Sequence, residues 1–167
     1  PSGKLPITFP RSVGQIQTVY NHKASQYSRK FALTTTGPLY HFGYGLSYTT
    51  FEYGNPVLSK DTIHTNEAVT VSFELANTGF CQGTEIAQLY IQDEYGTVTR
   101  PVKELKGFQR ITLNPGEKQR VSFLITPDKL AFFTSGKKYE VEPGSFKIMV
   151  GASSREQDLK IVSLMVK

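Results

Sequence analysis

The chain has 167 residues, 38% of them hydrophobic, with 19 basic and 14 acidic side chains and therefore a formal net charge of +5. This length fits one domain whose core is large enough to need neither disulfides nor a structural metal, and the single cysteine excludes a disulfide framework. No apolar run approaches the ~20 residues that a membrane-spanning helix requires, so no membrane insertion is expected.

Residues 1–60 differ from the rest of the chain in charge and in pattern. They contain six basic residues and one acid, Glu52, whereas residues 61–167 contain 13 of each. The six cations are dispersed, so we expect a solvated or partner-facing surface and no nucleic acid. Residues 5–9 predict a short edge strand because they include a proline and precede another. Residues 11–38 show no sustained period and predict irregular chain.

A concentration of aromatic residues follows, with six rings within fourteen positions. Since each ring buries roughly 150–250 Å² when covered, we expect a linker that packs on the sandwich or on another domain. The rings assigned to this packing are Tyr40, Phe42, Tyr44, Tyr48 and Phe51. A sugar-stacking platform is the alternative. No helical pattern follows Gly43 and Gly45, so we interpret them as permitting a tight backbone path between rings rather than as a phosphate loop.

From residue 57 onward, short strand patterns are separated by turn residues. Residues 68–76 alternate apolar and polar side chains with a period of two, and residues 85–93 do so with a phase slip near Ala87 and Gln88 that is typical of a β-bulge. Further strands are predicted at 105–113, 120–125, 139–141, 146–150 and 159–166, with one helical turn at 127–130. This pattern predicts an all-β fold, an antiparallel β-sandwich with an irregular N-terminal extension.

The sequence gives little support for catalysis. Glycoside hydrolysis normally needs two carboxyl groups roughly 5–10 Å apart, and residues 1–60 contain a single acid. The glutamates of the strand region occupy polar strand or turn positions, where solvated side chains are expected. They include Glu74, Glu85, Glu117, Glu140 and Glu142.

Metal and nucleophile chemistry is equally unsupported. His22, His41 and His64 lack metal-ligand spacing, Cys81 has no neighbouring histidine to activate it, and no Gly-x-Ser-x-Gly motif is present. We therefore expect no catalytic residue, no metal and no cofactor. The cluster Asn21, His22 and Lys23 has the donors to bind a polyol, or it satisfies a loop backbone.

Several motifs in a fixed order resemble the C-terminal part of glycoside hydrolase family 3 enzymes, the bacterial β-glucosidases and their xylosidase relatives. They are PSGKLPITFPRSVGQI at 1–16, YNHK at 20–23, PLYHFGYGLSYTTF at 38–51, NTG at 77–79, QLY at 88–90, TRPVKELKGF at 99–108 and VEPG at 141–144. The resemblance covers nearly the whole chain. Together with a chain that opens on Pro1 without a leader, it leads us to expect a fragment of a longer enzyme.

The resemblance implies a domain order. Residues 1–16 would be the terminal strand of a preceding α/β domain, residues 17–56 an aromatic linker, and residues 57–167 a fibronectin type III-like domain. The aspartate nucleophile and the glutamate acid/base of such enzymes would lie upstream of Pro1. The segment Asn21, His22 and Lys23 would be a substrate-side loop, continued here by residues 24–29, which differ from the family's usual Thr-Gly-Arg type.

The implied function is that of a non-catalytic module that stabilises the catalytic domains of a β-glycosidase, whose activity is hydrolysis of terminal β-linked glucose or related sugars. Its partners would be those domains, its location the periplasm or the exterior, and its basic N-terminal third would face the catalytic domains. Two alternatives stay open. One is a module that binds oligo- or polysaccharide through exposed tyrosines and phenylalanines, and the other is a protein-interaction β-sandwich.

Overall fold

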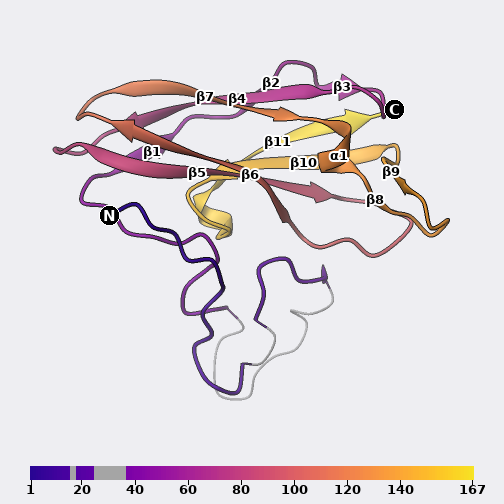
Figure 1. The fold of residues 1–167 in the computed structure, drawn as a ribbon, viewed down its shortest axis with the longest axis horizontal. Helices are drawn as coiled ribbons and strands as arrows, with labels where there is room; N and C mark the ends of the chain where they lie inside the picture. Colours follow the sequence, from indigo (N-terminus) through magenta and orange to yellow (C-terminus); the bar gives the residue numbers. More distant parts are fainter. Residues whose placement is uncertain (16–17, 25–36) are drawn as a thin grey trace.

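The structure, a computed structural model, describes residues 1–15, 18–24 and 37–167. Two β-sheets stack face to face, and the N-terminal segment, indigo to violet in Figure 1, lies on the side of the sandwich that carries β5 and β10. This arrangement confirms the predicted antiparallel β-sandwich with an irregular N-terminal extension. No helix among the described residues is long and apolar enough to cross a membrane.

The smaller sheet has four strands. Its centre is β4 (Val69–Asn77), which pairs along one edge with β7 (Lys118–Ile125) and along the other with two short strands in succession, β1 (Phe51–Tyr53) and β2 (Val57–Leu58). All of these pairs are antiparallel. Strand β1 falls within residues 17–56, the segment that the sequence assigns to the linker.

The larger sheet has five strands in the order β3-β11-β10-β5-β6. Their bounds are Thr62–Ile63, Leu159–Val166, Gly144–Gly151, Gly83–Asp93 and Glu104–Leu113. The pairs are antiparallel except for β3 with β11, which is parallel. The helical turn α1 (Pro127–Leu130) follows β7, and β8 (Phe132–Phe133) pairs with β9 (Tyr139–Glu140). A 3-10 turn, η2 (Glu156–Asp158), precedes β11.

The core lies between the two sheets and follows the predicted alternation. Val71, Phe73 and Leu75 of β4 point inward and meet Leu89 and Ile91 of β5. The long strands appear where the period-two pattern predicts them, with ends shifted by one or two residues, and the turn at 127–130 is confirmed. The short strands β1, β2, β3 and β8 were not predicted, because two or three residues carry no readable period.

Two local predictions need correction. Residues 5–9 form no strand; an isolated bridge joins Phe9 to Tyr40, and Leu5 exchanges backbone hydrogen bonds with the segment at residues 43–44. The bulge predicted near residues 87–88 lies instead between Leu89 and Tyr90, where the register with β6 shifts. The phase slip in the sequence has another cause, which is that both faces of β5 are buried.

Truncation of the core should show which side chains hold the sandwich together. We expect Leu89→Ala to lower the free energy of unfolding by about 3 kcal/mol, because Leu89 is fully buried between the sheets. Leu124→Ala is the matched control, since Leu124 on β7 is half exposed, and it should change stability by less than about 1 kcal/mol. Urea denaturation measures both, and equal losses would contradict the assignment of the core.

Candidate interdomain surface

The extension, defined here as the described residues among 1–50, covers part of the outer face of the five-stranded sheet, over β5 and β10. Tyr90 and Met149 point away from the core on this face and contact Tyr20 and Phe42 of the extension. The rings of Tyr20 and Phe42 stack with centroids 4.1 Å apart, and Tyr20 meets Tyr90 edge to face at 5.9 Å. The Tyr20 hydroxyl also accepts the backbone N–H of Leu105 at 3.2 Å. The extension is therefore part of the packed structure.

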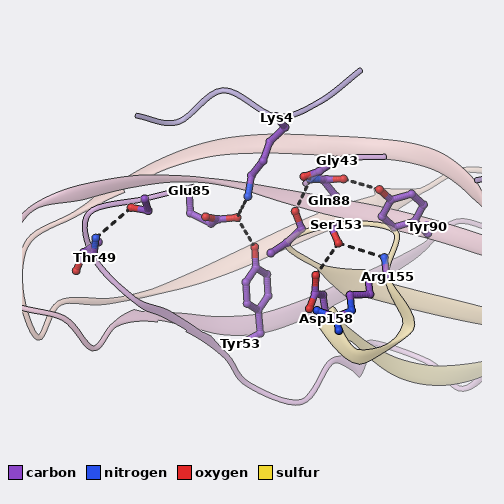
Figure 2. A network of polar contacts seen from close by, with 12 residues as sticks. Lys4, Gly43, Thr49, Tyr53, Glu85, Gln88, Tyr90, Ser153, Arg155 and Asp158 are labelled. Atoms are coloured by element: carbon purple, nitrogen blue, oxygen red, sulfur yellow. Dashed lines mark hydrogen bonds and ion pairs between the residues drawn. The ribbon is translucent and has the colours of Figure 1, made fainter. Parts of the chain in front are cut away.

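A buried ion pair joins the start of the extension to the sandwich (Figure 2). The Lys4 ammonium lies 2.8 Å from Oε1 of Glu85, which also accepts the Tyr53 hydroxyl at 3.1 Å. Glu85 is 5% exposed, so the prediction of a solvated side chain was wrong for this glutamate. Burial, reinforced by the Glu85 charge, raises the pKa of Tyr53 and keeps its hydroxyl a donor. Removing one partner of such a pair typically costs about 3–5 kcal/mol.

Gln88 holds the second contact between the extension and the sheet (Figure 2). Its amide nitrogen donates to the carbonyl oxygens of Gly43 at 3.1 Å and Ala152 at 2.7 Å, and its amide oxygen accepts the Tyr90 hydroxyl. Gly43 has φ +78°, and a Cβ there would lie 2.2 Å from the Gln88 amide oxygen. The glycine is thus required by its backbone conformation and by the close approach of Gln88, not by a passage between aromatic rings.

The turn that precedes β11 is fixed to the same region. Ser153 donates its hydroxyl to Asp158 at 2.6 Å and accepts the backbone N–H of Arg155 at 3.1 Å (Figure 2). The next residue, Ser154, donates its backbone N–H to the carbonyl of Phe42 at 2.9 Å. Residues 152–158 therefore form a third anchor for the extension.

The predicted substrate-side segment lies against the loop that leads into β6. The carbonyl of His22 accepts the backbone N–H of Val102 at 2.9 Å, and Lys23 forms an isolated bridge with Pro101. His22 also contacts the carbonyl of Lys23 through Nδ1, while Asn21 is exposed. Most of its continuation, at 25–29, lies outside the described residues. A role of this segment toward a substrate stays a prediction.

The five rings assigned to linker packing divide into four environments. Phe42 lies on the outer face of the large sheet and Phe51, in β1, packs against the core. Tyr40 and Tyr44 stack on each other at 5.3 Å within the extension, and Tyr40 is partly open to solvent. Tyr48 is 87% exposed. Their role in contacts between domains stays a prediction.

A cavity of about 450 Å³ opens between the extension, the loop before β6 and the turn at 152–158. Its wall includes Thr8, Tyr20, His41, Lys103, Ser154 and Arg155. Burial lowers the pKa of His41, and the positive charges of Arg155 and Lys103 act in the same direction, partly opposed by Asp158 and Glu156. Basic groups therefore dominate the polar part of this wall.

A second polar cluster lies around Arg100. Its guanidinium is 2.6 Å from Glu104 and 3.9 Å from Asp93, and it stacks over the ring of Phe132 at 4.3 Å. Burial raises the pKa of Asp93, with the Tyr95 N–H and Arg100 acting against it. Because the cation contacts both acids and the 450 Å³ cavity does not border them, the geometry suits a structural anchor better than acid/base chemistry.

Groups of three or more potential metal ligands are absent from the part of the chain that the structure describes. The sequence did not predict that Lys4, Glu85, Gln88, Lys103 and Ser154 organise the candidate surface. Only Gln88 left a signal, because it interrupts an apolar alternation.

The chain is similar to a known domain family and to parts of known glycosidases. Residues 85–154 match the fibronectin type III-like domain. The chain is 46% identical over 164 residues to a periplasmic β-glucosidase of Salmonella typhimurium, and 47% identical over 170 residues to a β-xylosidase of Formosa agariphila. These alignments cover 92% and 100% of this chain but 21% and 24% of the relatives.

Solved structures agree with these relatives. The whole chain superposes on part of a β-glucosidase from Erythrobacter marinus with a TM-score of 0.95 at 39% identity, covering 22% of that protein. A β-glucosidase from Listeria innocua, solved with glucose, gives a TM-score of 0.91 at 32% identity and is covered to 24%. The chain thus spans less than a quarter of the length of each of these proteins.

The contact between Gly43 and Gln88 should be sensitive to one added methyl group. We expect Gly43→Ala to destabilise the chain by about 2 kcal/mol or more, because alanine opposes the positive φ and meets the Gln88 amide. Gly37→Ala is the control, since nothing lies within 4 Å of its added Cβ. Thermal unfolding measures both variants. A Gly43→Ala variant as stable as the control would show that this contact does not hold the extension.

Proposed function

We propose that the chain is the C-terminal part of a glycoside hydrolase family 3 enzyme of the β-glucosidase type, and that it braces the catalytic domains of that enzyme without taking part in the chemistry. The observation that carries this proposal is the extent of the match. Relatives at 46–47% identity align along 92–100% of this chain and yet extend to four or five times its length.

The structure supports a bracing role because the segment leading in from the N-terminus is fixed at several places. The Lys4–Glu85 ion pair, the Gln88 hydrogen bonds and the stack of Tyr20 on Phe42 all hold the extension to the sandwich. A domain attached through residues 1–16 would therefore be coupled to the sandwich by packing and by a charged pair. A loose linker would transmit no such constraint.

The carboxylates of the described chain support a non-catalytic role. Glycoside hydrolysis needs an acid and a second carboxylate with space for a sugar between them. Glu85 is held in an ion pair with Lys4 and accepts a hydrogen bond from Tyr53, and Glu104 is held in an ion pair with Arg100. We propose that both catalytic carboxylates belong to the upstream domains, as the family resemblance implies.

Part of the excess positive charge of residues 1–60 serves contacts within the chain, which differs from what the sequence led us to expect. Lys4 is buried against Glu85, and Lys60 pairs with Glu67 on the surface of the sandwich. These two cations serve contacts within the chain, so the expectation that the whole excess faces the catalytic domains was wrong. Arg11 and Lys23 are exposed, and Arg29 and Lys30 lie outside the described residues.

We propose export to the periplasm or exterior, in line with the relative named periplasmic.

Binding of a polysaccharide is the second candidate, and one feature favours it. Phe133 and Tyr139, on β8 and β9, form an exposed ring pair with centroids 5.2 Å apart. Rings held in this way offer an apolar face to a sugar. Affinity electrophoresis discriminates between the proposals, because a sugar platform slows the migration of the chain in gels that contain polysaccharide. In that case Phe133→Ala would restore the normal migration rate. A brace migrates equally with and without polysaccharide.

The bracing proposal is tested by activity and by deletion. We expect residues 1–167 alone to give no turnover of aryl β-glucosides or aryl β-xylosides, because we place both catalytic carboxylates in the upstream domains. In the enzyme that carries this chain, deletion of residues 57–167 should lower the thermal unfolding temperature and reduce hydrolysis. Turnover by the isolated chain that is lost on mutation of one of its acids would overturn the proposal, as would a deletion without effect.

A further inference from the structure

Lys103 is a buried cation without an acidic partner. Its residue is 8% exposed, and its ammonium donates one hydrogen bond, to the carbonyl of Ser154 at 2.9 Å. No ion pair within 4.0 Å involves it among the residues that the structure describes. The other residues, 16–17 and 25–36, contain no aspartate or glutamate. No side-chain carboxylate of this chain therefore lies within ion-pair distance of Lys103.

Buried ammonium groups are almost always paired, because removing the charge from water is costly. An ammonium has three N–H donors, and Lys103 uses one of them for the Ser154 carbonyl. Burial lowers the pKa of Lys103, and Glu156 acts against that shift from beyond ion-pair distance. The site thus has unmet demand for a nearby negative charge.

The neighbouring groups have unmet hydrogen bonds as well. Among the residues that the structure describes, the hydroxyl of Ser154, a residue that is 4% exposed, has no hydrogen-bond partner, and neither has the buried hydroxyl of Thr8. Both residues line the same cavity of about 450 Å³ as Lys103. Buried polar atoms in folded proteins are rarely left unpaired. Two hydroxyls without partners and an ammonium without an ion-pair partner share one cavity, which is consistent with a single missing ligand.

The charged groups on the wall of the cavity also favour a ligand of negative charge. Lys103, Arg155 and His41 contribute basic groups, and Glu156 is the acidic residue on the wall. Hydroxyls of Ser154 and Thr8 can donate to an acceptor oxygen. An ammonium with adjacent hydroxyl donors is suited to a carboxylate, whose two oxygens accept several hydrogen bonds.

We propose that this cavity is a carboxylate-binding site, and that in the whole enzyme it receives an aspartate or glutamate side chain from the catalytic part. The cavity is bordered by the extension, through which the upstream domains would be attached, and the chain spans only 21–24% of its relatives. The inference rests on the proposed bracing function and gives it a location. Lys103 would form an ion pair with a carboxylate of the upstream domains, as Lys4 does with Glu85 within the chain.

A pair of lysine variants tests this site in two settings. In the whole enzyme, Lys103→Met should lower the thermal unfolding temperature by at least about 2 °C, because it leaves the incoming carboxylate buried and unpaired. In the isolated chain of residues 1–167, the same variant should leave that temperature unchanged or raise it, because it removes an unpaired charge. Lys4→Met is the matched control and should destabilise both forms, since its partner Glu85 lies within the chain.

Acetate is the probe for the site in the isolated chain. Sodium acetate should raise the unfolding temperature more than sodium chloride at equal ionic strength, and Lys103→Met should abolish that difference. If Lys103→Met destabilises the isolated chain and the enzyme equally, Lys103 is a structural residue and the proposal is wrong. If acetate stabilises the chain but the variant leaves the enzyme unchanged, the site takes a free anion and the side-chain proposal is wrong.

The outcomes also separate this inference from the bracing function. If deletion of residues 57–167 destabilises the enzyme and Lys103→Met does not, the bracing function is supported and the carboxylate-site proposal is wrong. When the deletion has no effect, the bracing function itself fails.

Discussion

Burial of the central strands of the large sheet, β5 and β10, on both of their faces is the constraint on which the rest of the structure depends. Antiparallel sheets of sandwiches commonly pack one face on the core and leave the other to water. Here the inner face of β5 carries Leu89 and Ile91, while its outer face carries Tyr90 beside Met149 of β10, and all four are buried. The outer pair is covered by the extension, so without the extension an apolar patch would meet water.

Polar contacts fix where the extension lies on that face. Hydrophobic burial has little directional preference, whereas the Lys4–Glu85 pair and the Gln88 amide each require one position of the chain. Gly43 permits the closest approach, because any side chain would occupy the space of the Gln88 amide. Packing and polar contacts together make extension and sandwich a single unit, which a brace between domains requires. The same surface contains Lys103, for which we propose a carboxylate partner from the catalytic domains.

The sequence predicts the sandwich well and its surface poorly, for a physical reason. Period-two alternation reports burial of one face, and it located β4, β7 and β11 to within one or two residues. On β5 it locates the strand to within two residues but misplaces the bulge at Gln88, because the outer face of this strand is also buried. Glu85 was expected to be solvated, because a single charged residue does not reveal what will cover it, and for the same reason nothing in the sequence marked Lys103 as buried. The family resemblance identified the module, but not the contacts that hold the extension to it.

Hydrogen–deuterium exchange of the isolated chain and of the whole enzyme tests the central claim most directly. The account predicts that the catalytic domains add protection on the extension and on the cavity wall at residues 101–106 and 152–157, with no change on β2 and β7 of the opposite sheet. Added protection on β2 and β7, or at the β8–β9 pair alone, would contradict it. So would identical exchange in the two forms, because a brace must exclude water where it contacts what it braces.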